Sequence, residues 1–174
     1  MTIERTGVFK LAGKDVTIVG EEINPGQKAL DFTVQALDWS LVRGLEDTKD
    51  KVRIIVAVPS LDTDTCDRET RRFNQAAAGL SDEIVIEVIS TDLPYAQKRW
   101  CVAASVDQVK VLSDHMTAEF GQKYGCLIKE RRILRRAVFV VDRQDKVVYA
   151  AYMPAQGMEP DYDEVLDAAR AALT

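Results

Sequence analysis

The sequence predicts an α/β fold with a central mixed β-sheet that is flanked by helices and preceded by an N-terminal β-hairpin. Apolar runs rich in β-branched residues, such as residues 52–58, have the length and composition of buried strands. Segments rich in helix formers alternate with these runs, which is typical of layered α/β domains. The 174 residues are enough to bury one full core, so we expect a single domain over residues 1–174.

The first third of the chain predicts mainly strands. Residues 8–11 and 16–19 flank a turn that contains glycine, and they predict the N-terminal hairpin. Residues 31–36 predict a short alternating strand, and residues 41–45 predict a helical turn. Residues 52–58 then predict a buried strand.

The middle of the chain alternates between helix and strand. Residues 67–79 are rich in helix formers and end at a glycine. Residues 84–89 predict a strand, and residues 93–104 predict a helix with Pro94 in its first turn, where proline is tolerated. Residues 109–112 predict another short strand. Strand–helix–strand units of this kind predict parallel pairing with right-handed crossovers.

The last third predicts a helix over residues 117–124, strands over residues 137–141 and 146–151, and a closing helix over residues 160–173. A short turn joins the two strands, so we expect them to pair as an antiparallel hairpin. The closing helix is amphipathic. Taken in order, the elements have the organisation of a thioredoxin-like fold with an N-terminal extension.

Composition excludes several classes of function. The net charge is −5, and acidic and basic residues are interspersed, which disfavours general binding to nucleic acids or anionic membranes. No apolar stretch approaches the roughly 20 residues of a membrane span. The first residues show no basic region followed by an apolar one, so we expect no secretory signal and a cytoplasmic location.

Cys66 is the strongest candidate for catalysis. It follows strand 52–58 by way of Pro59 and lies in or near the first turn of the next helix. Unpaired N–H groups and the positive end of the helix dipole stabilise a thiolate there. The hydroxyl of Thr63 can reach the same small volume, and Pro59 stiffens the strand exit. Each residue alone could be structural, but the pattern Pro-x-x-x-Thr-x-x-Cys at a strand-to-helix turn favours a catalytic role for Cys66.

The other cysteines allow two interpretations. Cys101 lies late in its predicted helix, where it is either a packed core residue or a thiol that condenses with a sulfenic acid at Cys66. Cys126 has apolar neighbours and is expected to be a buried, inert thiol. The chain has no Cys-x-x-Cys motif, and its single histidine, His115, is expected at the surface. A structural zinc site is therefore disfavoured.

Arg136 could support Cys66. Residues 129–136 form a charge run, a pattern that usually marks a solvated face. However, Arg136 directly precedes strand 137–141. If that strand lies beside strand 52–58, the guanidinium would stabilise the Cys66 thiolate and donate hydrogen bonds to a peroxide oxygen.

Several segments of the chain match the sequence motifs of one known protein family, in the same order, and together they span nearly the whole chain. They are residues 59–63, 66–67, 70–74, 92–101, 112–114, 124–125, 136–142 and 159–162. Through them the chain resembles the thiol peroxidases, which are atypical two-cysteine peroxiredoxins. The segment Leu-Pro-Tyr-Ala-Gln-Lys-Arg-Trp-Cys, within residues 92–101, points specifically to this branch.

The resemblance implies a role for each candidate residue. Cys66 is the peroxidatic cysteine, Thr63 and Arg136 position and polarise the peroxide, and Pro59 shields the sulfur. Cys101 resolves the sulfenic acid within the same chain. The resemblance further implies hydrogen peroxide and organic hydroperoxides as substrates, thioredoxin as the reductant, a homodimer, and no metal or organic cofactor.

Three residues next to or near the two candidate catalytic cysteines depart from the family pattern, and Cys126 stands where the family usually has an aliphatic residue. Asp64 and Thr65 stand where small or apolar residues usually precede the cysteine, and Val102 replaces the glycine that usually follows the resolving cysteine. Two alternative readings stay open on the same fold: a one-cysteine peroxiredoxin in which Cys101 is structural, and a thiol-based redox sensor or binding module. A thiol–disulfide oxidoreductase is disfavoured because Cys-x-x-Cys is missing.

Overall fold

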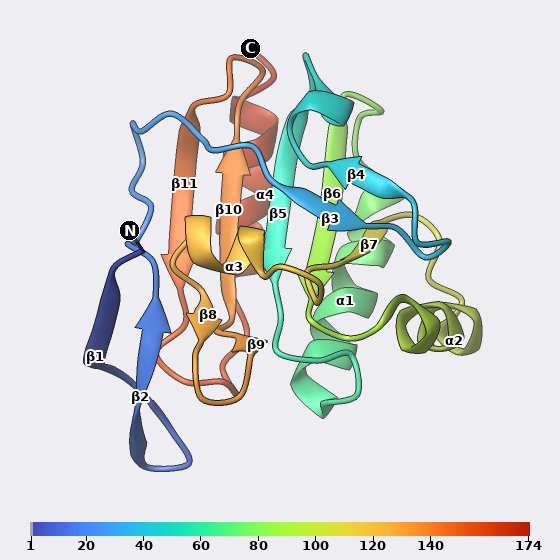
Figure 1. Cartoon of the computed structure of the whole chain (residues 1–174). Coiled ribbons are helices and arrows are strands. Elements are labelled where there is room, and N and C mark those ends of the chain that lie inside the picture. Colours follow the sequence, from blue (N-terminus) through green and yellow to red (C-terminus); the bar gives the residue numbers. More distant parts are fainter. Residues whose placement is uncertain (1) are drawn as a thin grey trace.

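The computed structural model describes residues 2–174, and a seven-stranded mixed sheet forms its centre (Figure 1). The strand order is β11-β10-β5-β6-β7-β3-β4. β5, β6 and β7 pair in parallel, and the other neighbours are antiparallel, so the predicted mixed sheet is confirmed. The strands are β3 (Thr33–Gln35), β4 (Leu41–Arg43), β5 (Val52–Ala57), β6 (Ile84–Ser90), β7 (Lys110–Ser113), β10 (Ala137–Val141) and β11 (Val147–Tyr152).

A second, four-stranded sheet contains the N-terminal hairpin. Its order is β1-β2-β8-β9. The predicted hairpin is confirmed and is longer than expected, with β1 over Glu4–Leu11 and β2 over Lys14–Val19. β8 (Leu127–Ile128) and β9 (Ile133–Leu134) were not predicted, because two residues are too few to show a period of two.

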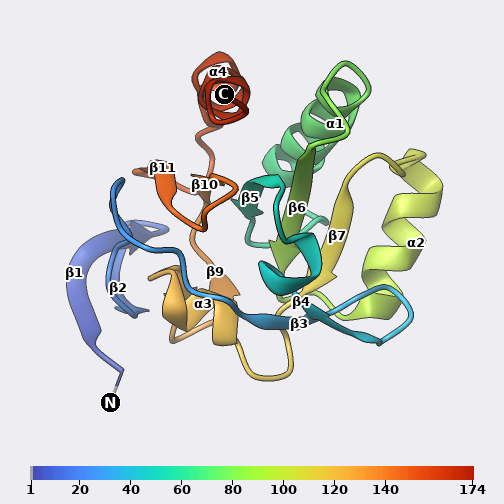
Figure 2. The same ribbon diagram turned by 90° about the horizontal axis from the view of Figure 1, so that it is seen from above.

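The helices cover both faces of the large sheet. α1 and α4 lie on one face, α3 lies on the other, and α2 stands beyond β7 (Figure 2). Their bounds are α1 (Asp64–Ala77), α2 (Pro94–Ala104), α3 (Glu119–Lys123) and α4 (Tyr162–Ala171). In residues 2–174 no helix combines the length and the apolar character needed to cross a membrane.

One predicted element is wrong. Residues 41–45 were expected to form a helical turn, but Leu41–Arg43 is β4 and pairs antiparallel with β3. A 3₁₀ turn, η1, begins only at Glu46 and ends at Thr48. The segment is too short for its pattern to separate helix from strand, so the pairing with β3 decides its structure.

Two apolar layers enclose the large sheet, and they separate the three cysteines. Alternate residues of each strand face opposite layers, as the pleat of a strand requires. Cys66 and Cys101 belong to the layer under α1 and α4. Cys126 belongs to the layer on the opposite face, which includes residues of α3.

The strand register determines where the candidate site lies. The parallel strands β5 and β6 end at the same edge of the sheet, and the chain leaves β5 there toward α1. β10 runs antiparallel to β5, and Ala137 lies opposite Ala57. The proposed adjacency of these two strands is therefore confirmed, and Arg136 enters β10 at the edge where β5 ends.

Candidate active site

Cys66 lies in the first turn of α1, where the strand-to-helix pattern had placed it. Thr63 is the N-cap residue, and its Oγ1 accepts a hydrogen bond from the Cys66 backbone N–H at 3.3 Å. The same hydroxyl donates to the carbonyl of Ser60 at 3.0 Å. Asp92, just after β6, fixes the loop because its carboxylate accepts bonds from Ser60 Oγ and the Leu61 N–H. The Cys66 side chain is fully buried.

The structure brings Arg136 into direct contact with the sulfur. Arg136 Nη2 donates to Cys66 Sγ at 3.2 Å, and only 1% of the arginine is exposed. The guanidinium places a positive charge and hydrogen-bond donors at the sulfur, and these remain able to bind an anion. Arg136 Nε and Nη2 also donate to the carbonyl of Gln156, so the planar group is held from two sides.

Glu69 is a site residue that the sequence interpretation missed. It is fully buried one turn after Cys66, and one of its carboxylate oxygens accepts a bond from Arg136 Nη1. Burial raises the pKa of Glu69, and the Arg136 guanidinium opposes that shift. The helical spacing of Glu69 from Cys66 could have indicated its burial. Four residues share the buried face of α1, namely Cys66, Glu69, Thr70 and Phe73.

The solvated face that usually accompanies a charge run does not extend to the last two arginines of residues 129–136. Both Arg135 and Arg136 are buried. The Arg135 guanidinium lies over the rings of Phe9, at 4.7 Å, and Tyr152, at 5.4 Å, and donates to a main-chain carbonyl. Arg135 therefore bridges the two sheets, and the partners of its guanidinium do not include Cys66.

Cys101 is a buried thiol near the end of α2. Burial raises its pKa to about 11, so the thiol is protonated at neutral pH. Cys66 and Cys101 are both free thiols in this structure. A cavity of about 570 Å³ opens beside Cys101 and includes Leu37 and Lys98 in its lining, and Val102 is exposed at its rim.

The other residues singled out from the sequence make no hydrogen bond to Cys66. Pro59 is buried in the loop between β5 and α1. Asp64 is exposed in the first turn of α1, so its carboxylate faces solvent. Cys126 is fully buried, and burial raises its pKa, in agreement with an inert thiol. His115 was expected at the surface, but it is half-buried and packs edge-on against Trp39 with ring centroids 5.2 Å apart.

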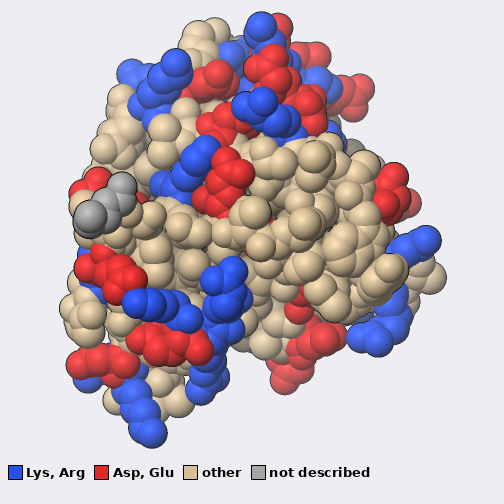
Figure 3. All heavy atoms as spheres, viewed as in Figure 1, with Lys and Arg blue, Asp and Glu red and all other residues tan. Residues whose placement is uncertain are grey.

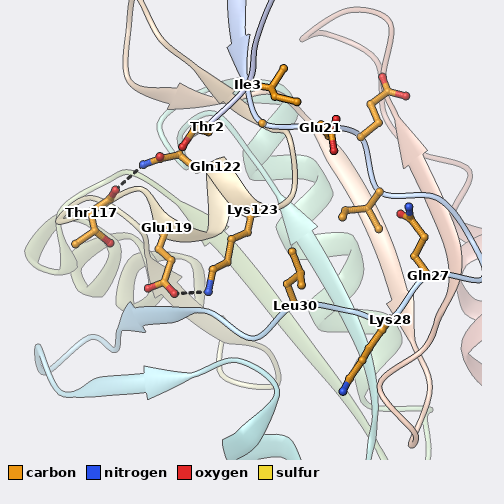
Figure 4. Close-up of a pocket in the computed structure, with 13 residues that line it drawn as sticks. Thr2, Ile3, Glu21, Gln27, Lys28, Leu30, Thr117, Glu119, Gln122 and Lys123 are labelled. Atoms are coloured by element: carbon orange, nitrogen blue, oxygen red, sulfur yellow. Dashed lines mark hydrogen bonds and ion pairs between the residues drawn. The ribbon is translucent and has the colours of Figure 1, made fainter.

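A second, larger cavity lies away from the cysteines (Figure 4). It has a volume of about 720 Å³ and lies between the start of the chain, the segment around Leu30, and α3. Two polar contacts line it, an ion pair of Lys123 with Glu119 and a hydrogen bond from Gln122 to the Thr117 carbonyl. No cysteine lines this cavity. Within residues 2–174, no cluster of three or more His, Cys, Asp or Glu residues is arranged to hold a metal ion.

The fold agrees with comparisons to known proteins. Residues 24–166 match the Redoxin family. The crystal structure of a peroxiredoxin-like protein from Aquifex aeolicus superposes with a TM-score of 0.85, covers 98% of both chains, and is 39% identical in sequence. These matches define the class of protein and confirm the predicted fold.

Relatives named thiol peroxidase refine the assignment. The protein of Halalkalibacterium halodurans is 48% identical over 161 residues, which cover 92% of this chain and 96% of the relative. That of Oceanobacillus iheyensis is 52% identical over 151 residues, which cover 87% and 91%. The chain belongs to the Redoxin family and, within it, to the thiol peroxidases, which are peroxiredoxin-type oxidoreductases.

Proposed function

We propose that this enzyme reduces hydrogen peroxide and organic hydroperoxides with Cys66 as the attacking nucleophile. The contact of Arg136 Nη2 with Cys66 Sγ at 3.2 Å carries the proposal, because it pairs a buried sulfur with a fixed cationic donor. Glu69 and Gln156 hold the guanidinium in that orientation. Cys66 also lies in the first turn of a helix of 14 residues, where the helix dipole favours an anion.

In the first step the Cys66 thiolate attacks the terminal oxygen of the hydroperoxide. The O–O bond breaks, the leaving oxygen takes up a proton as water or an alcohol, and Cys66 becomes a sulfenic acid. Arg136 stabilises the charge that develops on the oxygens. The Thr63 hydroxyl and the Cys66 N–H, which donate to the Ser60 carbonyl and to Thr63 Oγ1 in this structure, must turn to the peroxide to act as further donors. Pro59 is buried at the strand exit and shields the sulfur from bulk water.

In the second step Cys101 attacks the sulfenic sulfur, a disulfide forms between the two cysteines, and water leaves. The layering of the fold supports this choice. Cys101 shares its apolar layer with Cys66, whereas Cys126 lies on the opposite face of the sheet. Thioredoxin then reduces the disulfide and returns both thiols.

A coupled assay tests the proposal. NADPH consumption is measured with thioredoxin, thioredoxin reductase and cumene hydroperoxide for the wild type, Cys66→Ser and Cys101→Ser. We expect sustained turnover in the wild type, none in Cys66→Ser, and a single turnover in Cys101→Ser. Full activity of Cys101→Ser would instead indicate a one-cysteine enzyme. Stoichiometric peroxide loss without turnover in the wild type would indicate a redox sensor.

We further propose a homodimer that uses an exposed apolar patch. Figure 3 shows charged side chains of both signs around a broad uncharged area over β3, β7 and the neighbourhood of α2. The exposed side chains Leu41, Leu93, Tyr95 and Met116 support this assignment. Leu93 follows Asp92, the residue that anchors the Cys66 loop, so a partner here would also border the active site. Sedimentation of Tyr95→Asp and Met116→Glu at micromolar concentration tests the patch, and unchanged dimers would rule it out.

A cytoplasmic location is also proposed. It rests on the cysteine usage of the sequence, since three cysteines in 174 residues are too few for a disulfide scaffold. Fractionation of cells that produce the protein, with activity measured in each fraction, tests this location.

A further inference from the structure

A hydrogen bond joins the residues that flank the two reactive cysteines. Asp67 directly follows Cys66 in α1, and Trp100 directly precedes Cys101 in α2. The indole Nε1 of Trp100 donates to Asp67 Oδ1 at 2.9 Å. One side-chain contact therefore connects the peroxidatic segment to the resolving segment.

Arg71 reinforces this contact from both sides. Its Nε donates to the other oxygen of Asp67, Oδ2, at 2.8 Å. Its guanidinium lies 5.7 Å from the centre of the Trp100 ring, within range of a cation–π interaction. Its Nη1 also reaches the Ala104 carbonyl, in the last turn of α2, at 3.5 Å. Asp67, Arg71 and Trp100 thus form a closed set of contacts across the two helices.

A second link lies further along the same helix. Asn74 Oδ1 accepts bonds from the backbone N–H groups of Asp107, at 3.2 Å, and Gln108, at 2.7 Å. This contact holds the loop after α2 and does not touch either cysteine segment. The Asp67–Trp100 hydrogen bond is therefore the link between the helices that lies next to Cys66 and Cys101 in the chain.

We propose that the Asp67–Trp100 hydrogen bond, supported by Arg71, is a latch that must open before Cys101 can resolve the Cys66 sulfenic acid. The proposal rests on the proposed function and makes Asp67, Arg71 and Trp100 positioning residues for its second step. The step itself forms one S–S bond and breaks one S–O bond. The Cys101 proton and the departing hydroxide leave as water.

The surroundings of Cys101 explain why opening matters. The thiol is buried, and burial raises its pKa to about 11, so the closed state holds it as a weak nucleophile. Exposure to water removes that penalty. Asp67 and Trp100 are both only half-buried, so water can replace their mutual hydrogen bond at a modest cost in free energy. Because each is next to a cysteine in the chain, loss of this bond removes one restraint from both segments at once.

Alkylation of the reduced protein tests the latch without peroxide chemistry. Wild type, Trp100→Phe and Tyr149→Phe are treated with N-ethylmaleimide, and the labelling of each cysteine is followed by peptide mass spectrometry. Trp100→Phe removes the donor and keeps an aromatic ring. Tyr149→Phe is the matched control, since it deletes one aromatic donor to a carboxylate, Glu164, on the far side of the same layer. Cys126, which is fully buried, reports global unfolding.

We expect Cys101 to react about fivefold faster in Trp100→Phe, the effect of removing one hydrogen bond from the closed state. Cys126 should stay slow in every protein, and Tyr149→Phe should match the wild type. Asp67→Ala should accelerate Cys101 labelling in the wild-type background and much less in Trp100→Phe. Equal Cys101 rates in wild type and Trp100→Phe would overturn the latch. Parallel acceleration of Cys126 would also overturn it, because the bond would then serve only global stability.

Rapid-quench kinetics with one equivalent of hydrogen peroxide tests the catalytic consequence. Trp100→Phe should form the Cys66–Cys101 disulfide about fivefold faster than the wild type, by the same hydrogen-bond argument, whereas oxidation of Cys66 should not accelerate. If the wild type forms no such disulfide, the proposed resolving role fails and the latch fails with it. If the disulfide forms at equal rates in both proteins, only the latch fails.

Discussion

Cys66 and Cys101 are buried in the same apolar layer, yet their surroundings differ in kind. Cys66 meets a helix N-terminus and a guanidinium that Glu69 and Gln156 hold in place. Cys101 gains only burial, which raises its pKa to about 11. Burial alone leaves Cys101 a protonated thiol at neutral pH, whereas Cys66 has an oriented cationic donor beside its sulfur. This difference supports the proposal that the two cysteines act in sequence, Cys66 in the closed fold and Cys101 after exposure.

Removing the oriented cation should have the largest effect. Arg136→Lys retains a positive charge but loses the planar fork that reaches Cys66, Glu69 and Gln156 together. We expect the rate constant for Cys66 oxidation to fall about 10²- to 10³-fold, the usual loss when one oriented donor is removed. Stopped-flow measurement of peroxide consumption checks this, with circular dichroism as the control for folding. A fall of less than about threefold would remove Arg136 from the mechanism.

The reactivity of Cys101 should depend on pH over an unusually high range. With its pKa raised from 9.0 to about 11, the folded protein holds about 100-fold less Cys101 thiolate at pH 8 than an unfolded chain does. Alkylation of Cys101 should therefore keep rising, about tenfold per pH unit, past pH 9 and toward pH 11. Peptide mapping after timed alkylation measures this profile. A plateau near pH 9 would show that Cys101 is already exposed in the resting protein.

Two buried carboxyl groups extend the comparison. Glu69 has Arg136 as a partner, whereas neither carboxylate oxygen of Glu87, in β6, has a hydrogen-bond partner among residues 2–174. Burial raises the pKa of Glu87 to about 8 from 4.5, so the folded state binds a proton more tightly than the unfolded chain. The associated stability is fully present below about pH 4.5 and is lost as the pH rises toward 8.

The free energy of unfolding of the wild type should therefore contain a term that falls with pH between about 5 and 8, by at most about 1.4 kcal/mol per unit. Glu87→Gln should remove that slope and stabilise the protein most at pH 8. Urea denaturation at several pH values measures it, with Glu164→Gln as the exposed control. Parallel slopes in wild type and Glu87→Gln would show that Glu87 is not the group responsible.

A smaller effect is expected at the partner of Arg136. Glu69→Gln keeps an oxygen that can accept from Nη1 but loses the negative charge that fixes the guanidinium. We expect the rate constant for Cys66 oxidation to fall roughly fivefold, part of the usual value of a hydrogen bond to a charged group. A positioning role also predicts that Glu69→Ala loses more activity than Glu69→Gln. Equal loss in both variants would indicate that Glu69 acts through its charge alone.

Most of the fold could be predicted from the sequence because its strands are long, apolar and β-branched. The failures were short elements. Leu41–Arg43 was predicted as a helical turn, and β8 and β9 were not predicted at all. Their structure depends on pairing with distant strands, which a local pattern does not contain.

Cys66, Thr63 and Arg136 were identified from local patterns, because each lies at the start of a predictable element. Glu69 was missed because an acidic residue in a helix is usually solvated, and only its spacing from Cys66 marked it as buried. The contact between Asp67 and Trp100 could not be predicted either, since it depends on how two helices lie against each other.

One measurement tests the central claim most directly. The fully reduced protein is treated with one equivalent of cumene hydroperoxide, free thiols are blocked, and the peptides are mapped by mass spectrometry without reduction. The account predicts one disulfide, between Cys66 and Cys101, with Cys126 recovered as a blocked free thiol. A disulfide that includes Cys126, or oxidation of Cys101 with Cys66 left reduced, would contradict it.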